Sequence, residues 1–206
     1  MPAQTILEHI KAIASLAQIG LLYSKENYDR ERYTEILERS KQSVELLTGA
    51  EIQKLHEFYA VPEDYITPKV DVRAFVLNDA NEVLMVKEKA DGLWSIPGGW
   101  ADVGHSPAEI AVKEVFEESG LQVKAKRLLG VADKRKHPHP PALHYVYKIF
   151  VACEITGGTL QKTHDILDNG FFKLDALPPL SEERILQSQI EQLYETLINN
   201  APAFID

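Results

Sequence analysis

The chain has 206 residues, which suffices for one full domain or for one domain with a small second one. Its formal net charge of −9 argues against a broad nucleic-acid-binding surface, which would need an excess of Lys and Arg, although a small basic pocket remains compatible with it. The single cysteine, Cys153, excludes an intrachain disulfide and fits a reducing compartment. No apolar run has the length of a membrane span and the N-terminus lacks a signal-peptide pattern, so we expect a cytoplasmic protein without membrane contact.

The first 60 residues have the apolar spacing of amphipathic helices. One stripe consists of Ile6, Ile10, Ile13, Ala17 and Leu21, and a second of Tyr33, Ile36, Leu37, Val44 and Leu47. A third short helix is predicted over Glu51–Tyr59, before a proline-containing linker over Ala60–Val70. Helices of this length have little core of their own, so residues 1–60 are predicted to be a small helical domain that serves dimerisation or covers the substrate site. We therefore expect a homodimer.

After the linker the apolar period changes to two, which is typical of strands. Strands are predicted over Val70–Leu77 and Glu82–Lys89, joined by a turn at Asn78–Asn81 into a hairpin. A short extended piece, Leu93–Gly99, ends in a tight glycine turn. Further strands are predicted over Val123–Asp133, Ala142–Ile155 and Gly170–Leu174, with a turn at Gly157-Gly158, and a last helix over Ser181–Asn200 with Ser181 as its N-cap. These elements predict an α/β fold with a mixed sheet covered by helices.

A well-bounded helix is predicted in the middle of this series. Ser106 is a suitable N-cap, Pro107 fits the first helical position, Glu109 completes a capping box, and Gly120 is a suitable stop.

Three glutamates, Glu114, Glu117 and Glu118, project from one face of that helix, because they stand at i, i+3 and i+4. They could form an ordinary solvated face. However, like charges at this spacing destabilise a helix by roughly 0.2–0.5 kcal/mol per pair, and carboxylates late in a helix meet the negative end of its dipole. A hard divalent cation, which prefers oxygen ligands, explains this placement better. A backbone carbonyl from the preceding Gly98-Gly99 turn could join the ligands.

The segment from Gly99 to Leu121 resembles the Nudix box, which has a glycine, five residues, Glu, seven residues, Arg-Glu, an aliphatic residue, any residue, Glu-Glu, any residue, Gly and an aliphatic residue. The match has no gaps, and the resemblance covers about Thr67 to Leu180. The chain is similar to Nudix hydrolases, in particular to a bacterial subgroup with a helical N-terminal domain described as ADP-ribose or CDP-choline pyrophosphatases. The resemblance implies an α/β/α sandwich over residues 67–206.

The resemblance also implies a metal-dependent pyrophosphatase that acts on a nucleoside diphosphate linked to another group. Mg²⁺ or Mn²⁺ would be held by Glu114, Glu117, Glu118 and the carbonyl of Gly98. Glu117 and Glu118 are thus the expected catalytic carboxylates. Water attacks one phosphorus of the P–O–P bridge, and the metal neutralises the phosphate oxygens and lowers the pKa of the water.

Two positions depart from the box. His105 replaces the first glutamate and Lys113 replaces the arginine, both of which support the metal-binding glutamates in the family. Lys113 keeps the charge but loses the bidentate fork. We expect His105 to be a tolerated supporting residue rather than a new ligand, and it could make activity more dependent on pH.

Other candidates lie outside the box. Asp168 stands shortly before an aromatic pair, where relatives often carry the acid that activates water, although it could equally form a turn in Asp168-Asn169-Gly170. Arg73 is either a salt-bridged strand residue or a phosphate clamp, and Trp100 could stack on a base or ribose or pack in the core. The basic segment Lys134–Pro141 is either a solvated loop tip or a site for substrate phosphates. Its candidate residues are Lys134, Arg135, Lys136, His137 and His139.

The leading interpretation is hydrolysis of ADP-ribose, CDP-choline or a similar conjugate. Two alternatives remain: a catalytically weak domain that binds a nucleotide and regulates another process, and an RNA-end pyrophosphohydrolase, against which the net charge counts for extended RNA contact.

Overall fold

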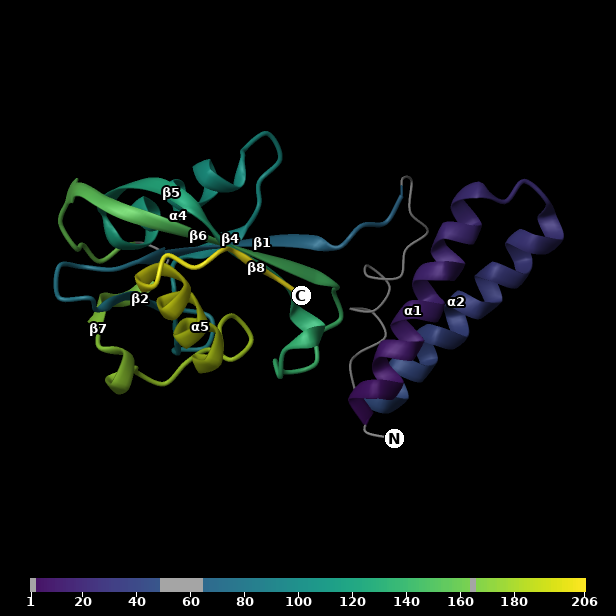
Figure 1. Cartoon of the computed structure of the whole chain (residues 1–206). Coiled ribbons are helices and arrows are strands. Elements are labelled where there is room, and N and C mark those ends of the chain that lie inside the picture. The colour runs from purple at the N-terminus through teal and green to yellow at the C-terminus, as the bar shows by residue number, and fades with distance from the viewer. Residues whose placement is uncertain (1–2, 49–64, 164–165) are drawn as a thin grey trace. The chain divides into compact units, whose positions relative to one another are not determined.

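The computed structural model describes residues 3–48, 65–163 and 166–206. The chain divides into two compact units. The first comprises Met1–Thr67 with Pro141–Leu143, and the second comprises Pro68–Pro140 with His144–Asp206. Figure 1 shows a helical part and a part built on a sheet.

The helical unit contains two helices that pack side by side, α1 (Ala3–Tyr23) and α2 (Asn27–Thr48) (Figure 1). Their shared core contains Leu7, Ala14, Ala17 and Leu21 from α1 and Leu37 and Val44 from α2. The buried stripe of α1 is therefore rotated from the predicted one, because Ile6 and Ile13 keep 39% and 49% of their surface exposed. The predicted third helix and residues 60–64 of the predicted linker lie outside the described residues.

The expectation that no apolar run has the length of a membrane span was wrong for α1. The stretch Thr5–Tyr23 is 19 residues long with a mean hydropathy of 1.3, so by length and composition alone it could cross a membrane. Core helices of soluble proteins and signal sequences meet the same criterion. The stretch also carries a buried charge, since Lys11 is 1% exposed and its Nζ lies 3.0 Å from a carboxylate oxygen of Glu8.

The second unit contains two sheets with the strand orders β4-β1-β6-β5-β8 and β3-β2-β7. The strands are β1 (Lys69–Val76), β2 (Val83–Glu88), β3 (Trp94–Ser95), β4 (Gly98–Trp100), β5 (Leu121–Asp133), β6 (Val146–Gly158), β7 (Ile166–Phe172) and β8 (Phe204–Ile205). The helices are α4 (Pro107–Ser119), α5 (Gln187–Ile198) and the short 3₁₀ turns η1 (Lys134–Lys136) and η2 (Leu174–Ala176). Since β1 pairs parallel with β6 but antiparallel with β4, the sheet is mixed, as predicted.

The two long helices of this unit pack against different hydrophobic clusters. Ile110 and Val115 of α4 pack with Val72 of β1, whereas Leu193 of α5 packs with Phe75 of β1. Because Val72 and Phe75 lie three positions apart on the strand, their side chains point to opposite faces of β1. The mixed sheet thus lies between helices, which confirms the predicted fold class.

The predicted hairpin was wrong. The turn is present, since the side chain of Asn78 accepts hydrogen bonds from the backbone N–H groups of Ala80 and Glu82. However, β1 and β2 belong to different sheets and meet only in an isolated bridge between Leu77 and Val83. Strand β1 is paired along its length with β6 instead, a long-range pairing that local spacing does not reveal.

Three features of the second half also differ from prediction. Gly157 and Gly158 do not form a separate turn but end β6, paired with the start of β5. The last helix begins at Gln187 rather than after Ser181, because Ser181 starts a separate turn in which its carbonyl accepts from the N–H groups of Arg184 and Ile185. Strand β8 was not predicted.

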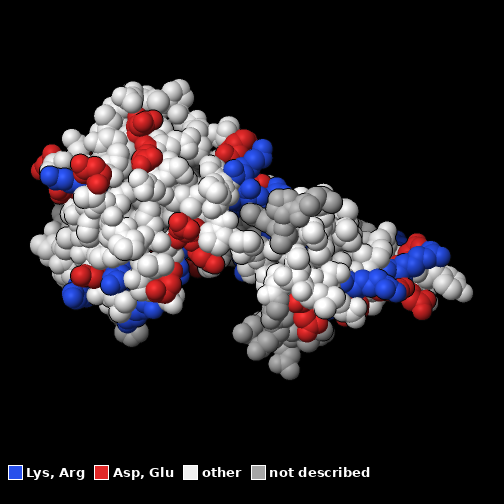
Figure 2. Space-filling model, turned by 90° about the horizontal axis from the view of Figure 1, so that it is seen from below, with Lys and Arg blue, Asp and Glu red and all other residues white. Residues whose placement is uncertain are grey.

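Charged side chains are mixed on the face shown in Figure 2, where Lys and Arg lie next to Asp and Glu.

Candidate functional site

Helix α4 has the predicted boundaries. The hydroxyl of Ser106 accepts from the N–H of Glu109 at 3.3 Å, and the carboxylate of Glu109 accepts from the N–H of Ser106 at 2.8 Å. Gly120 ends the helix in the left-handed conformation with φ of 78°. These caps fix which side chains of α4 point toward β1 and β4.

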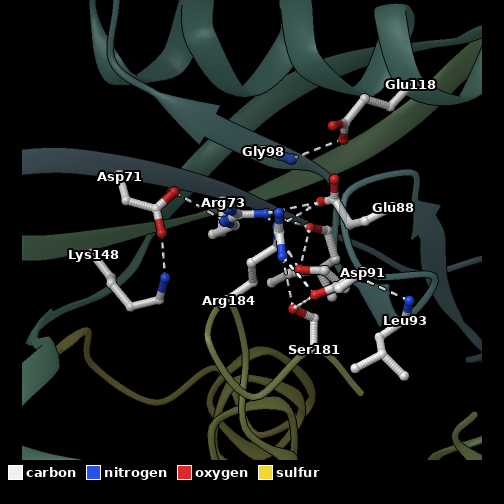
Figure 3. A network of polar contacts seen from close by, with 12 residues as sticks. Asp71, Arg73, Glu88, Asp91, Leu93, Gly98, Glu118, Lys148, Ser181 and Arg184 are labelled. Atoms are coloured by element: carbon white, nitrogen blue, oxygen red, sulfur yellow. Dashed lines mark hydrogen bonds and ion pairs between the residues drawn. The ribbon is translucent and has the colours of Figure 1, made fainter. Parts of the chain in front are cut away.

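Glu118 is the deepest of the three predicted metal ligands. It is 9% exposed, and its Oε2 accepts a hydrogen bond from the backbone N–H of Gly98 at 3.0 Å (Figure 3). Burial raises the pKa of Glu118 to about 8; the charge of Arg73 opposes this rise, whereas Glu88 and Glu114 add to it. Gly98 has φ of 146°, and a Cβ there would lie 2.1 Å from the carbonyl oxygen of Val72, so only glycine fits.

The other two glutamates lie farther out on the same helix. Burial raises the pKa of Glu114, whose carboxylate oxygens would lie 3.4 Å from a Cβ added to Gly99. Glu117 is exposed and pairs with Nζ of Lys113 at 3.4 Å. Within the described parts of the chain, no three Asp, Glu, His or Cys side chains are gathered closely enough to hold a metal ion as they stand.

The donor set nevertheless suits a hard divalent cation. All the side-chain atoms concerned are carboxylate oxygens, which Mg²⁺ and Mn²⁺ prefer. Glu118 is buried near two further carboxylates, Glu88 and Glu114, an arrangement that favours protonation unless a cation compensates the charge. The missing side chain at Gly99 leaves Glu114 close to the backbone of β4. The chemistry of these donors therefore fits a hard divalent cation.

Arg73 lies at the centre of a buried charge network (Figure 3). Its Nε donates to Asp71 at 2.9 Å, and its Nη1 donates to the Ser95 hydroxyl and the Ile96 carbonyl, both at 3.2 Å. Lys148 donates to the other carboxylate oxygen of Asp71. Sequence reasoning left open an ion pair or a phosphate clamp, and the geometry accounts for Nε and Nη1 as structural donors.

The pKa values of this network follow from its burial and pairing. Burial opposes ionisation of Asp71, but the charges of Arg73 and Lys148 outweigh it and hold the pKa of Asp71 below its usual value. Burial lowers the pKa of Lys148 to about 8, although Asp71 favours its charged form. Asp71 is thus shared by two cations, and Glu88, 3.9 Å from Nη1 of Arg73, adds a second negative charge to the network.

This network forms part of a cleft of about 320 Å³. The cleft is lined by Asp71, Arg73, Glu88, Gly98, Gly99, Trp100, Lys134, Val146, Lys148, Glu183 and Arg184. Sequence reasoning proposed Arg73, Gly98, Trp100 and Lys134. It assigned no role to Asp71, Glu88, Lys148, Glu183 or Arg184. For Lys148 a signal existed, because it alternates with apolar residues on a strand in the same way as Arg73.

Trp100 is 53% exposed and lines the cleft, with Nζ of Lys69 5.3 Å from its ring centroid. It is therefore not a core residue.

Asp168 lies on β7 rather than in a turn, and its carboxylate is 3.8 Å from Nζ of Lys162. It does not line the cleft. The neighbouring Asn169 donates to the carbonyl of Glu118 at 3.1 Å, so this part of β7 lies beside the end of α4.

Only Lys134 of the predicted basic segment lines the cleft. Arg135 pairs with Asp133 and lies over the ring of Tyr145, beside a separate depression. His137 pairs with Asp206 at 3.2 Å. His139 is 4% exposed with Nδ1 2.6 Å from the carbonyl of Glu182, and burial lowers its pKa to about 4. Lys136 belongs to η1 and is not among the residues that line the cleft.

The two departures from the Nudix box differ in their contacts. Lys113 bridges Asp102 at 3.0 Å and Glu117 at 3.4 Å, so it supports one of the predicted ligands. His105 is exposed, and its electrostatic neighbour is Glu109 of the capping box, whose pKa is lowered first by hydrogen bonds from Ser106 and further by His105. The structure thus places His105 beside the start of α4.

Comparisons with known proteins agree with this arrangement. Residues 67–193 match the sequence model described as NUDIX domain, and residues 4–59 match the one described as UDP-X-like, N-terminal oligomerisation domain. A putative ADP-ribose pyrophosphatase of Bacillus subtilis is 42% identical over 93% of this chain and 91% of its own length. An ADP-ribose pyrophosphatase of Methanocaldococcus jannaschii is 33% identical over 60% of this chain and 73% of its own length.

Two solved structures are similar over long stretches. A crystal structure of a UDP-X diphosphatase is 30% identical with a TM-score of 0.64, and the match covers 100% of both chains. A crystal structure of an ADP-ribose pyrophosphatase from Streptococcus suis is 39% identical with a TM-score of 0.62, and it covers 68% of this chain and 100% of its own.

Proposed function

The chain belongs to the Nudix family, and from this premise we propose that it hydrolyses the pyrophosphate bond of ADP-ribose or a closely similar nucleoside diphosphate conjugate with Mg²⁺ or Mn²⁺. The observation that carries the proposal is the buried carboxylate of Glu118, bonded to the N–H of Gly98 at the edge of a cleft. The relatives named ADP-ribose pyrophosphatase support the substrate.

Glu114, Glu117, Glu118 and the carbonyl of Gly98 would hold the ion. When bound, it would neutralise phosphate oxygens and lower the pKa of the attacking water. Lys113 holds Glu117 at 3.4 Å and so limits its rotation. The N–H of Gly98 fixes one oxygen of Glu118 and leaves the other for the ion.

The reaction balances without an added reactant other than water. The water oxygen forms a bond to one phosphorus, the bridging P–O bond breaks, and the bridging oxygen leaves with the other phosphate. ADP-ribose then gives AMP and ribose 5-phosphate. The proton of the water passes to a carboxylate, for which Asp168 stays our prediction, since β7 lies beside the end of α4.

A UDP-linked conjugate is a second candidate substrate. The similarity to the UDP-X diphosphatase extends over both chains completely, and the helical segment matches a UDP-X-like sequence model. CDP-choline, suggested by the family resemblance, belongs to the same chemical class.

The proposal is tested by measuring phosphate-bearing products from ADP-ribose, a UDP-sugar, CDP-choline and capped RNA, each with Mg²⁺, with Mn²⁺ and with EDTA. We expect turnover of ADP-ribose that requires the metal ion. Turnover of RNA ends alone would mean that RNA ends, and not nucleoside diphosphate conjugates, are the substrate. Nucleotide binding without any turnover would establish the regulatory alternative.

The cleft suits a small nucleotide rather than extended nucleic acid, and cytoplasmic location remains part of the proposal. The match of residues 4–59 to an oligomerisation domain supports an oligomer, which we propose is a homodimer.

A further inference from the structure

Arg184 lies on the segment before α5 and lines the cleft together with Gly98 and Trp100. Figure 3 shows its side chain held between two groups of oxygens. Its Nε lies 3.2 Å from Oε1 of Glu88. Its Nη1 donates to Asp91 at 2.8 Å and to the hydroxyl of Ser181 at 2.9 Å. Two of the three guanidinium nitrogens thus fix the orientation of the group.

The partners of Arg184 are themselves held in place. The hydroxyl of Ser181 donates to Asp91 at 2.7 Å, and the other carboxylate oxygen of Asp91 accepts from the N–H of Leu93 at 3.0 Å. Ser181 is 1% exposed. The guanidinium is therefore fixed by a network that reaches the loop after β2 and the turn before α5.

The third nitrogen, Nη2, has no hydrogen bond within residues 3–48, 65–163 and 166–206. The side chain keeps 25% of its surface exposed. Nη2 carries two N–H donors, and a charged guanidinium N–H forms a strong charge-assisted hydrogen bond with a phosphate oxygen. Arg184 thus has free donors on a side chain whose orientation is already fixed.

The cleft is less negative than the protein as a whole. Its lining contains four cations, Arg73, Lys134, Lys148 and Arg184, and three carboxylates, Asp71, Glu88 and Glu183, and a fourth carboxylate, Asp91, pairs with Arg184, so the charges balance. The whole chain, by contrast, has a net charge of −9. Oxyanions are therefore attracted to this cleft more than to the average surface of the protein.

Glu88 connects Arg184 to the predicted metal site. Its carboxylate pairs with Arg184, lies 3.9 Å from Nη1 of Arg73, and is one of the charges that act on Glu118. An anion bound to Arg184 would therefore lie on the same side of the unit as the predicted metal ligands.

We propose that Arg184 is a specificity-determining residue that binds a phosphate oxyanion of the nucleoside diphosphate through Nη2, and that Ser181, Asp91 and Glu88 are its positioning residues. This inference rests on the proposed function for the identity of the substrate. An arginine that merely bridges acidic residues would stabilise the fold without distinguishing phosphate-bearing ligands from neutral ones.

The test is calorimetric titration of ADP and of adenosine, both with EDTA, into the full-length wild type, Arg184→Gln, Arg184→Lys and Lys126→Gln. Lys126 is the matched control, because it is also a cation paired with a carboxylate, Glu154 at 2.6 Å, but it does not line the cleft. Loss of a charged hydrogen bond predicts that Arg184→Gln weakens ADP binding by about 10- to 100-fold. Adenosine binding should stay unchanged in every variant, and Lys126→Gln should bind ADP like the wild type.

Arg184→Lys and one added variant, Ser181→Ala, keep the test decisive. Arg184→Lys retains the charge but loses Nη2 and the planar group that Glu88 and Asp91 orient, so we expect an intermediate affinity for ADP. Ser181→Ala removes one positioning bond and should weaken ADP binding by less than Arg184→Gln does. If Arg184→Gln does not fold, the result for these two variants decides.

Three results would overturn the inference: ADP affinity independent of Arg184, equal losses for ADP and adenosine, or no binding of ADP by the wild type. The proposed function is judged separately. If ADP affinity depends on Arg184 but no conjugate is hydrolysed, the anion site stands and the activity fails. If conjugates are hydrolysed but ADP affinity is the same in the wild type and in the Arg184 variants, the activity stands and the anion site fails.

Discussion

Glu117 and Glu118 should both be indispensable for turnover, although they differ in burial. We expect Glu117→Gln and Glu118→Gln each to lower kcat on ADP-ribose by roughly 100-fold or more, because an amide cannot replace the charge that a metal ion requires. Steady-state kinetics with Mg²⁺ measures this loss, and titration of Mn²⁺ by electron paramagnetic resonance measures ion binding without turnover.

Glu154→Gln is the control for these variants, since Glu154 is an exposed carboxylate paired with Lys126 outside the cleft. It should leave kcat unchanged. Wild-type kcat in both Glu117→Gln and Glu118→Gln would remove the metal assignment.

The raised pKa of Glu118 predicts a pH-dependent stability of the metal-free protein. Its pKa of about 8 exceeds the ordinary 4.5, so its contribution to stability is full below pH 4.5 and is lost as the pH rises through 8. His139 acts in the opposite sense, because its pKa is lowered from 6.5 to about 4 and its contribution is lost as the pH falls through that range.

Between pH 6.5 and about 7.5, therefore, Glu118 should dominate the change, because Lys148, whose pKa is lowered to about 8, acts in the opposite sense mainly from pH 8 upward. Thermal melting with EDTA should show wild-type stability falling over this window, and Glu118→Gln should flatten the curve. If the melting temperature of Glu118→Gln falls with pH as steeply as that of the wild type, the pH dependence belongs to another titrating group.

At the scale of residues, the sequence allowed the glutamates, Gly98 and Trp100 to be proposed, because a local spacing connects them. Glu88 and Arg184 could not be found in this way. They lie on β2 and before α5, and only the three-dimensional fold brings them together at 3.2 Å.

At the scale of elements, the capping box of α4 should stabilise the helix that carries all three predicted ligands. Ser106→Ala removes the hydroxyl that accepts from Glu109 N–H, and N-cap losses of this kind typically cost about 1 kcal/mol. We expect a decrease of that size in the free energy of unfolding, measured by urea denaturation.

Ser43→Ala is a suitable comparison, because Ser43 lies within α2 and its hydroxyl bonds only the preceding turn, at Arg39. It should change stability little. If Ser106→Ala and Ser43→Ala lower the free energy of unfolding equally, the N-cap of α4 stabilises the protein no more than an ordinary helix hydroxyl does.

Local signals predicted α4 to the residue because its caps are encoded next to it. The start of α5 was missed because the hydroxyl of Ser181 donates to the distant Asp91 instead of capping a helix. The hairpin was mispredicted for a related reason: β1 finds its partner in β6, more than sixty residues away in the sequence. Local chemistry thus defines elements better than it defines their pairing.

At the scale of the whole molecule, the helical unit exposes apolar side chains that its own core does not use. Leu16, Tyr23 and Leu46 are 68%, 65% and 87% exposed in the single chain. Large exposed apolar side chains on a small helical unit favour association with another chain. The match of this region to an oligomerisation domain gives the same indication.

We therefore expect the protein to sediment as a homodimer at micromolar concentration. Leu16→Glu and Leu46→Glu should each weaken the affinity of the dimer by roughly 10-fold or more, because burying an unpaired charge opposes association. Ile198→Glu is the matched control, because Ile198 is 50% exposed at the end of α5, in the other unit. It should leave the sedimentation coefficient unchanged. A wild-type monomer at these concentrations would contradict the dimer. A dimer sensitive to Ile198→Glu but not to Leu16→Glu would place the interface on the sheet-containing unit instead.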